Sequence, residues 1–228
     1  SSVTNMFGMF QSSSFNKDIG NWDVSSATSI GAMFASSPFN KDISSWDVSN
    51  VTTMNGLFQF GVFNQPIGNW IVSNVTDMSS MFRQSPFNQD ISSWDVSSVT
   101  NMEYMFQSTP FNQNISSWDV SSSNNMKEMF YGATTFNSNI SSWNVSNVTN
   151  MRAMFGYAYN FNQDISSWDV SNVINMIYMF YSWSTQMNFG YNLSSWDVSN
   201  VSDCSDFIKT TNTKTTNFII PNFSNCAP

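Results

Sequence analysis

The sequence predicts a repeat solenoid of about eight coils, all of which share one sequence pattern. Three observations carry this prediction. Tryptophan recurs at intervals of 24 residues and later 25, phenylalanine and isoleucine recur in register with it, and 41% of the 228 residues are hydrophobic. A chain of this composition buries a substantial core, and a unit this short buries its apolar face only by stacking on copies of itself.

The repeating columns extend along most of the chain. The tryptophan column is Trp22, Trp46, Trp70, Trp94, Trp118, Trp143, Trp168 and Trp196. The phenylalanine column is Phe15, Phe39, Phe63, Phe87, Phe111, Phe136, Phe161 and Phe189. An isoleucine column follows four residues later and ends in leucine, at Ile19, Ile43, Ile67, Ile91, Ile115, Ile140, Ile165 and Leu193.

One complete coil reads FNQDISSWDVSSVTNMEYMFQST. Its first half alternates apolar and polar residues through Trp94 and Val96, which predicts a short parallel β-strand. In its second half, Met105 and Phe106 follow Met102 by three and four residues, which predicts a short helix or 3₁₀ segment. Each coil of 24–25 residues is therefore expected to contain one strand and one short helical segment.

Two further columns have polar or flexible side chains. We expect the asparagines to form a ladder that satisfies backbone groups of the turns in the interior, and the methionines to fill the core. The asparagine column is Asn16, Asn40, Asn64, Asn88, Asn112, Asn137 and Asn162. The methionine column is Met54, Met78, Met102, Met126, Met151 and Met176.

The two ends of the array differ. Residues 1–202 are predicted to form the solenoid, with an incomplete first coil, and residues 203–228 to form a C-terminal cap or connector. Cys204 and Cys226, the two cysteines of the chain, lie in this last segment and are expected to form a disulfide bond, typical of an oxidising compartment.

The N-terminal coil is predicted to expose core-type side chains, namely Val3, Met6, Met9 and Phe10. Two interpretations stay open. In one, this end contacts the opposite end of a second subunit, and head-to-tail contacts build a fibre. In the other, the chain is a fragment of a longer array whose preceding coil covers these side chains.

Composition argues against several classes of function. A formal charge of −8, with no histidine and seven lysines and arginines, disfavours binding to nucleic acid. No stretch is apolar over the length of a membrane span. The sequence contains no nucleophile elbow and no phosphate-binding loop, and its carboxylates repeat in like surroundings. We therefore expect neither an enzyme nor a bound cofactor.

An outward-facing column of aspartates is the nearest approach to a metal site. Calcium bridging between coils is conceivable because carboxylate oxygens suit calcium, but no glycine-rich calcium loop accompanies them. A solvated acidic stripe that also binds turn amides is the favoured interpretation. The column is Asp23, Asp47, Asp95, Asp119, Asp169 and Asp197.

The chain also contains nine Asn-x-Ser/Thr motifs, which are candidate N-glycosylation sites. They fall mainly in two turns of the repeat, so glycans would run in rows along the array. The candidates are Asn50, Asn74, Asn114, Asn139, Asn144, Asn147, Asn192, Asn200 and Asn222.

The repeat resembles a known family. The segments SSATSIGAMFASS and DVSNVTTMNGLF, and the unit FNQDISSWDVSNVTNMxxMF, are similar to the BspA-like, or PARCEL-type, leucine-rich repeats of surface proteins. This resemblance implies a leucine-rich-repeat-like solenoid, an extracellular or cell-surface location, and a role in adhesion or surface architecture. It supplies no catalytic residues.

Two functions from different classes follow. The first is an extracellular structural protein that associates head to tail into a fibre or surface layer, with glycosylation as a candidate modification. The second is an adhesin that binds a protein or glycan of a host or neighbouring cell. The monotony of the outward serines and aspartates favours the first, whereas the aromatic residues Tyr178, Tyr181, Trp183 and Tyr191 favour the second.

Overall fold

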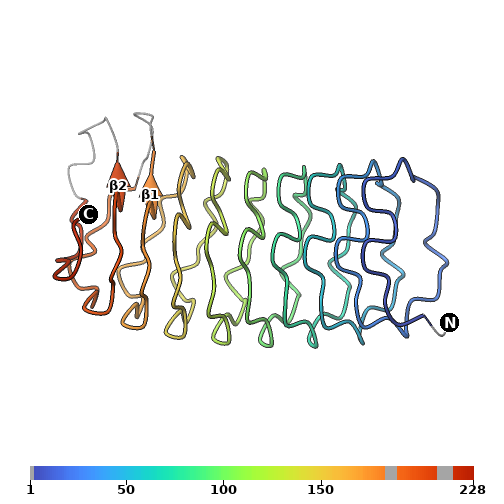
Figure 1. Cartoon of the computed structure of the whole chain (residues 1–228), viewed down its shortest axis with the longest axis horizontal. Helices are drawn as coiled ribbons and strands as arrows, with labels where there is room; N and C mark the ends of the chain where they lie inside the picture. Colours follow the sequence, from blue (N-terminus) through green and yellow to red (C-terminus); the bar gives the residue numbers. More distant parts are fainter. Residues whose placement is uncertain (1–2, 183–188, 210–217) are drawn as a thin grey trace.

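The chain winds into successive coils that lie side by side along the long axis of the molecule, with the N-terminus at one end and the C-terminus at the other (Figure 1). This computed structural model describes residues 3–182, 189–209 and 218–228. Within these ranges there is no helix, and the strands are β1 (Phe180–Tyr181) and β2 (Ile208–Lys209). β1 and β2 pair in parallel, with Phe180 opposite Ile208. Accordingly, the described part of the chain holds no helix long and apolar enough to cross a membrane.

Neighbouring coils are joined by a column of single parallel bridges. Each bridge links one residue to its equivalent in the next coil, so the backbone register follows the sequence repeat. The column runs through Asn5, Ser29, Thr53, Asp77, Asn101, Asn125, Asn150, Asn175 and Asp203.

The division of each coil into a strand and a helical segment differs from the expectation. The bridge at Asn101 opens the half that was expected to be helical, and no extended strand forms around Trp94. In that half, Tyr104 and Ser108 adopt left-handed backbone angles, with φ of 60° and 54°, which a right-handed helix does not accommodate.

The backbone hydrogen bonds explain the difference. The N–H of Tyr104 donates to the carbonyl of Lys127 in the next coil at 2.9 Å, and the N–H of Phe106 donates to Met129 at 2.9 Å. An α-helix would direct both groups to its own preceding turn. The three- and four-residue spacing therefore predicted correctly which side chains face inward. It did not predict the backbone structure, because the N–H groups donate to the next coil instead of to a helical turn.

The left-handed positions give a stability prediction. Ala32 has φ of 50° at the coil position that glycine occupies at Gly8 and Gly56, whereas the buried Ala35 has no left-handed angle. A left-handed conformation costs a residue with a Cβ about 1–2 kcal/mol. Ala32→Gly should therefore be less destabilising than Ala35→Gly by about 1–2 kcal/mol. Equal losses in urea unfolding would contradict the left-handed assignment.

The core is a stack of aromatic rings that continues from coil to coil. The Phe106 ring lies 4.1 Å from Phe111, which opens the next coil, and 5.7 Å from Phe82 and from Phe130 in the preceding and following coils, measured between centroids. The isoleucine and methionine columns are buried beside it, which confirms the core assignment of the methionines. Every coil thus covers the apolar surface of the next.

The tryptophan column binds each coil to the one before it. The indole Nε1 of Trp118 donates to the carbonyl oxygen of Ile91 at 3.2 Å, and Trp94 donates to Ile67 at 3.1 Å. These rings are buried, so the bond satisfies a donor that water does not reach. The indole donors of this series are Trp46, Trp70, Trp94, Trp118, Trp143, Trp168 and Trp196.

The predicted asparagine ladder is confirmed, although it lies at the surface. The side-chain oxygen of Asn88 accepts a hydrogen bond from the backbone N–H of Asn112 at 3.0 Å, and the pattern continues through the column. Asn112 is exposed and Asn88 is half-buried, so the expected interior position was wrong. A short amide at the turn reaches the next backbone without entering the core.

The C-terminal segment contains the predicted disulfide bond, between Cys204 and Cys226, whose Cα atoms lie 5.8 Å apart. Asn192 also forms a parallel bridge with Ile219. At the opposite end, Val3 and Met9 are exposed, at 43% and 46%. Met6 is buried and Phe10 is half-buried, because Met6 packs into the first layer of the core and the Phe10 ring stacks on Phe15 and Phe34.

Candidate functional site: a face of coil-specific side chains

The second half of each coil, which contains the left-handed positions and is called the turn half from here on, presents outward side chains that differ from one coil to the next. We call this surface the variable face and define it by the side chains that contact one another there. In contrast, the opposite half of each coil repeats nearly the same aspartate and serine residues. The variable face comprises Phe60, Arg83, Glu103, Tyr104, Gln107, Lys127, Glu128, Tyr131, Arg152, Tyr157, Tyr178 and Tyr181.

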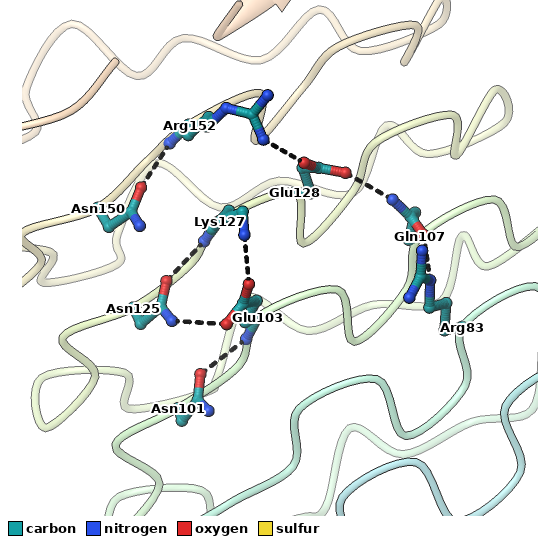
Figure 2. A network of polar contacts seen from close by, with 9 residues as sticks. All are labelled: Arg83, Asn101, Glu103, Gln107, Asn125, Lys127, Glu128, Asn150 and Arg152. Carbon is teal, nitrogen blue, oxygen red and sulfur yellow. Dashed lines mark hydrogen bonds and ion pairs between the residues drawn. The ribbon is translucent and has the colours of Figure 1, made fainter. Parts of the chain in front are cut away.

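Charged side chains on this face pair across the coils (Figure 2). The Lys127 Nζ lies 2.8 Å from Oε1 of Glu103, and Nδ2 of Asn125 donates to the other oxygen of Glu103 at 3.1 Å. Asn125 in turn accepts the backbone N–H of Lys127 at 3.1 Å. Glu103 is therefore held by two donors from the following coil.

A second polar chain runs beside the first (Figure 2). Arg83 donates from Nε to the amide oxygen of Gln107, whose nitrogen donates to Oε2 of Glu128 at 2.6 Å. The other oxygen of Glu128 accepts a hydrogen bond from Arg152 at 2.9 Å. Gln107, in the middle of this series of hydrogen bonds, is buried, so both of its amide contacts are shielded from water.

The cations of this face also lie over aromatic rings. The guanidinium carbon of Arg83 is 4.7 Å from the ring centroid of Tyr104, and Nζ of Lys127 is 4.8 Å from the same ring. Arg152 lies 5.8 Å from the ring of Tyr178. Such contacts stabilise both the charge and the ring orientation.

Toward the C-terminal end the face is hollowed. Six of the side chains that line the hollow are Glu128, Tyr131, Arg152, Tyr157, Tyr178 and Tyr181. Its volume is about 290 Å³, and we call it the tyrosine hollow.

The rings of the tyrosine hollow are packed edge to face. Centroids are 5.2 Å apart for Tyr131 and Tyr157, 5.6 Å for Tyr157 and Tyr181, and 4.9 Å for Tyr181 and Tyr178. Burial raises the pKa of Tyr131 and of Tyr181, so both phenols stay neutral hydrogen-bonding groups at physiological pH. The arrangement combines ring surfaces with an ion pair, and it is suited to binding.

Comparison with known families identifies the chain. The family described as "Mycoplasma protein of unknown function, DUF285" matches residues 1–85, 37–133, 59–159 and 108–222. The chain belongs to the DUF285 family. The overlapping matches make this DUF285 member a tandem-repeat protein, in agreement with its coils. No curated protein and no solved structure matches the chain.

In this DUF285 chain, the aspartates of the outward-facing column accept hydrogen bonds from serines of the turns. The Oδ1 atom of Asp95 accepts hydrogen bonds from the Ser97 hydroxyl at 2.6 Å and from the Ser97 N–H at 3.1 Å. These bonds, the hydroxyl first, hold the pKa of the Asp95 carboxyl below its usual range. Asp119 and Asp169 have equivalent serine partners. Among the described residues, no three acidic or cysteine side chains gather as a metal site would require.

The lowered pKa values predict acid sensitivity. A carboxyl whose pKa is lower in the folded state stabilises the fold above its unfolded pKa of about 3.9, and this stabilisation is lost as the pH falls through the folded value. Unfolding free energy should therefore decrease below about pH 4. The variant Asp95→Asn/Asp119→Asn/Asp169→Asn retains the acceptor oxygens and should show a shallower decrease. Identical pH profiles would contradict this role.

The candidate glycosylation sites fall into two structural classes. In one class the side-chain nitrogen is engaged: Nδ2 of Asn74 donates to the carbonyl of Ser49 in the preceding coil at 2.7 Å. In the other class the oxygen is engaged, as in Asn139, which accepts from Ser141 at 3.0 Å. The first class is Asn50, Asn74, Asn147 and Asn200. The second is Asn114, Asn139, Asn144 and Asn192. Asn222 is exposed in the C-terminal segment.

Sequence reasoning found only part of the hollow. Of the aromatic residues singled out, Tyr178 and Tyr181 line it, Tyr191 packs against Phe189, and Trp183 lies outside the described residues. Tyr131 and Tyr157 went unnoticed as site residues. The sequence does contain a signal for them. Both tyrosines stand in the turn half of their coils, at positions where earlier coils have residues other than tyrosine.

Proposed function

We propose that this protein is a non-enzymatic repeat scaffold of an extracellular or cell surface, and that it binds a partner through the variable face. One observation carries the proposal: side chains that differ between coils gather on one face, whereas the opposite face repeats. A structural lattice needs only repeated contacts, but recognition of a particular partner needs particular aromatic and charged groups at fixed positions.

Several features support the rest of the proposal. The repeat motif and the stacked coils fit a BspA-like, leucine-rich-repeat-like solenoid, a class that presents extended surfaces for binding. The disulfide bond between Cys204 and Cys226 favours an oxidising compartment. The absence of histidine from the sequence, and the engagement of the repeated aspartates with serine partners, favour a role without catalysis.

The test compares the two faces in the intact chain. In the variable-face variant, Tyr157→Ser and Tyr178→Ser install the residue found at equivalent left-handed positions, Ser108 and Ser80. We expect this variant to lose at least about tenfold in binding to cultured cells or to immobilised matrix, as removal of two aromatic contacts predicts. The repeated-face control is Asp95→Gln/Asp119→Gln/Asp169→Gln, which creates no Asn-x-Ser motif and should bind normally.

Thermal unfolding of each variant provides the necessary folding check. If both variants remain folded and bind as the parent chain does, the variable face is not the binding surface. If only the repeated-face control loses binding, the assignment of the two faces is reversed and the proposal fails.

A second candidate is head-to-tail assembly into a fibre or surface layer. The specific observation is that Val3 and Met9 are exposed at the N-terminal end, at 43% and 46%, whereas the equivalent residues of the next coil, Ala27 and Met33, are buried. A preceding coil would cover Val3 and Met9, whether it belongs to the same chain or to another copy. Light scattering and electron microscopy of concentrated native protein test this candidate, and persistent monomers would exclude it. Intact mass of the same material tests glycosylation.

A further inference from the structure

The tyrosine hollow has the dimensions and the wall of a small-ligand site. Its volume of about 290 Å³ is at the lower end of the range for such sites and suits one or two sugar rings. Tyr131, Tyr157 and Tyr181 come from three successive coils: the N–H of Gly132 donates to Gly156 at 2.7 Å, and the N–H of Tyr157 donates to Tyr181 at 2.8 Å. The rings therefore form a fixed wall along the direction in which the coils stack.

The charges in the hollow are already paired with each other. Arg152 donates to Glu128 at 2.9 Å, and the second oxygen of Glu128 accepts from Gln107 at 2.6 Å. This pairing orients Arg152 and Glu128, and among the residues that the structure describes Glu128 is the one acceptor of the Arg152 guanidinium, so its other N–H groups can donate to a ligand. A neutral ligand with several hydroxyl groups can use such donors and acceptors without bringing an unpaired charge into the hollow.

A charged ligand fits less well. A cationic side chain would meet Arg152, which lies over the ring of Tyr178, and Lys209, whose Nζ is 5.9 Å from the ring centroid of Tyr181. An anionic ligand would meet Glu128 and approach a chain with a formal charge of −8. The surroundings therefore disfavour both signs of charge.

From these features we propose that the tyrosine hollow binds a neutral saccharide. The C–H face of a pyranose ring packs on the face of a tyrosine ring, since the positive hydrogens meet the negative ring face. Its hydroxyl groups bond to Arg152, Glu128 and the neutral phenols. This inference rests on the proposed binding function and names the ligand class of the same face.

The experiment measures binding of the intact chain to immobilised oligosaccharides. The probes are neutral oligosaccharides built from glucose, galactose, mannose or N-acetylglucosamine, together with sialylated and sulfated oligosaccharides and an oligolysine peptide. We expect weak, reproducible binding to at least one neutral probe. Tyr157→Ser should reduce it by at least about tenfold, the effect of losing one well-placed aromatic contact.

The matched control is Gln84→Ser. Gln84 and Tyr157 occupy equivalent positions in their coils, with φ of 51° and 56°, and Gln84 belongs neither to the hollow nor to the variable face. A second pair sets Tyr178→Ser against Ile71→Ala, because Ile71 is 62% exposed in the half of the coil that repeats. Both controls should retain binding. If Tyr157→Ser fails to fold, the Tyr178 pair decides the result.

The outcomes separate this inference from the broader function. Binding only to oligolysine, or only to acidic oligosaccharides, overturns the neutral-saccharide assignment. Failure to bind any probe, with cell binding still dependent on the variable face, also overturns it and leaves the proposed function standing. Loss of neutral binding in the controls as much as in the hollow variants places the ligand elsewhere and overturns the inference.

Discussion

Replacement of Phe106 by alanine is expected to lower the free energy of unfolding by about 3–5 kcal/mol, the usual cost of emptying a large buried aromatic site. Phe106 is fully buried and its ring contacts Phe82, Phe111, Trp118 and Phe130. Phe82 belongs to the preceding coil, and the other three neighbours belong to the following coil. The substitution therefore removes contacts to the coils on both sides at once.

Urea unfolding followed by tryptophan fluorescence measures this effect. Phe60→Ala is the control, because Phe60 is 44% exposed and contacts the Arg83 side chain rather than the core. Phe60→Ala should lower the free energy of unfolding by less than about 1 kcal/mol, as for most surface substitutions. Equal losses for the two variants would mean that the aromatic stack does not hold the coils together.

Loss of the disulfide bond is expected to have the second largest effect. Cys204 and Cys226 are 22 residues apart, and a crosslink that closes a loop of this size stabilises a fold by about 3 kcal/mol in the chain-entropy account. Cys226→Ser should therefore lower the unfolding free energy by about 2–4 kcal/mol. We choose Cys226 because Cys204 is fully buried, and its substitution would also disturb packing.

Thermal unfolding with and without a reducing agent checks this prediction. The reductant should destabilise the parent chain as much as the substitution does, and it should leave Cys226→Ser unchanged. A parent chain that is insensitive to reductant would show that the bond is absent in solution or contributes nothing to stability.

The sequence was sufficient to predict the inward-facing columns. Four columns of apolar residues recur along the chain, and their members in one coil are all buried, namely Phe111, Ile115, Trp118 and Met126. Side-chain polarity reports burial directly, so a strict repeat makes such columns visible without a structure. The disulfide bond was predictable for a similar reason, since the chain offers one pair of cysteines.

The path of the backbone was less predictable. A spacing of three and four residues fits a helix, but it fits equally the turns that the chain adopts around Tyr104 and Ser108, where N–H groups donate to the next coil. Hydrophobic spacing gives no information about the acceptor of a backbone N–H. For the same reason, the bond from Trp118 to the carbonyl of Ile91 was not foreseen.

The tyrosine hollow escaped sequence analysis because it depends on the stacking of coils. Tyr131 and Tyr157 are 26 residues apart in sequence, yet their ring centroids are 5.2 Å apart. The repeat predicts that equivalent positions become neighbours, but it does not predict which turn side chains point outward and converge. Residues that depart from the repeat proved more informative about binding than the residues that follow it.

Hydroxyl-radical footprinting of the intact chain bound to cells or to an immobilised ligand tests the central claim most directly. Oxidation is measured at individual aromatic side chains with and without the partner. The account predicts protection of Tyr131, Tyr157 and Tyr178, with the exposed Trp22 oxidised as in the free chain. Protection of Trp22 with unchanged oxidation of the three tyrosines would contradict the account.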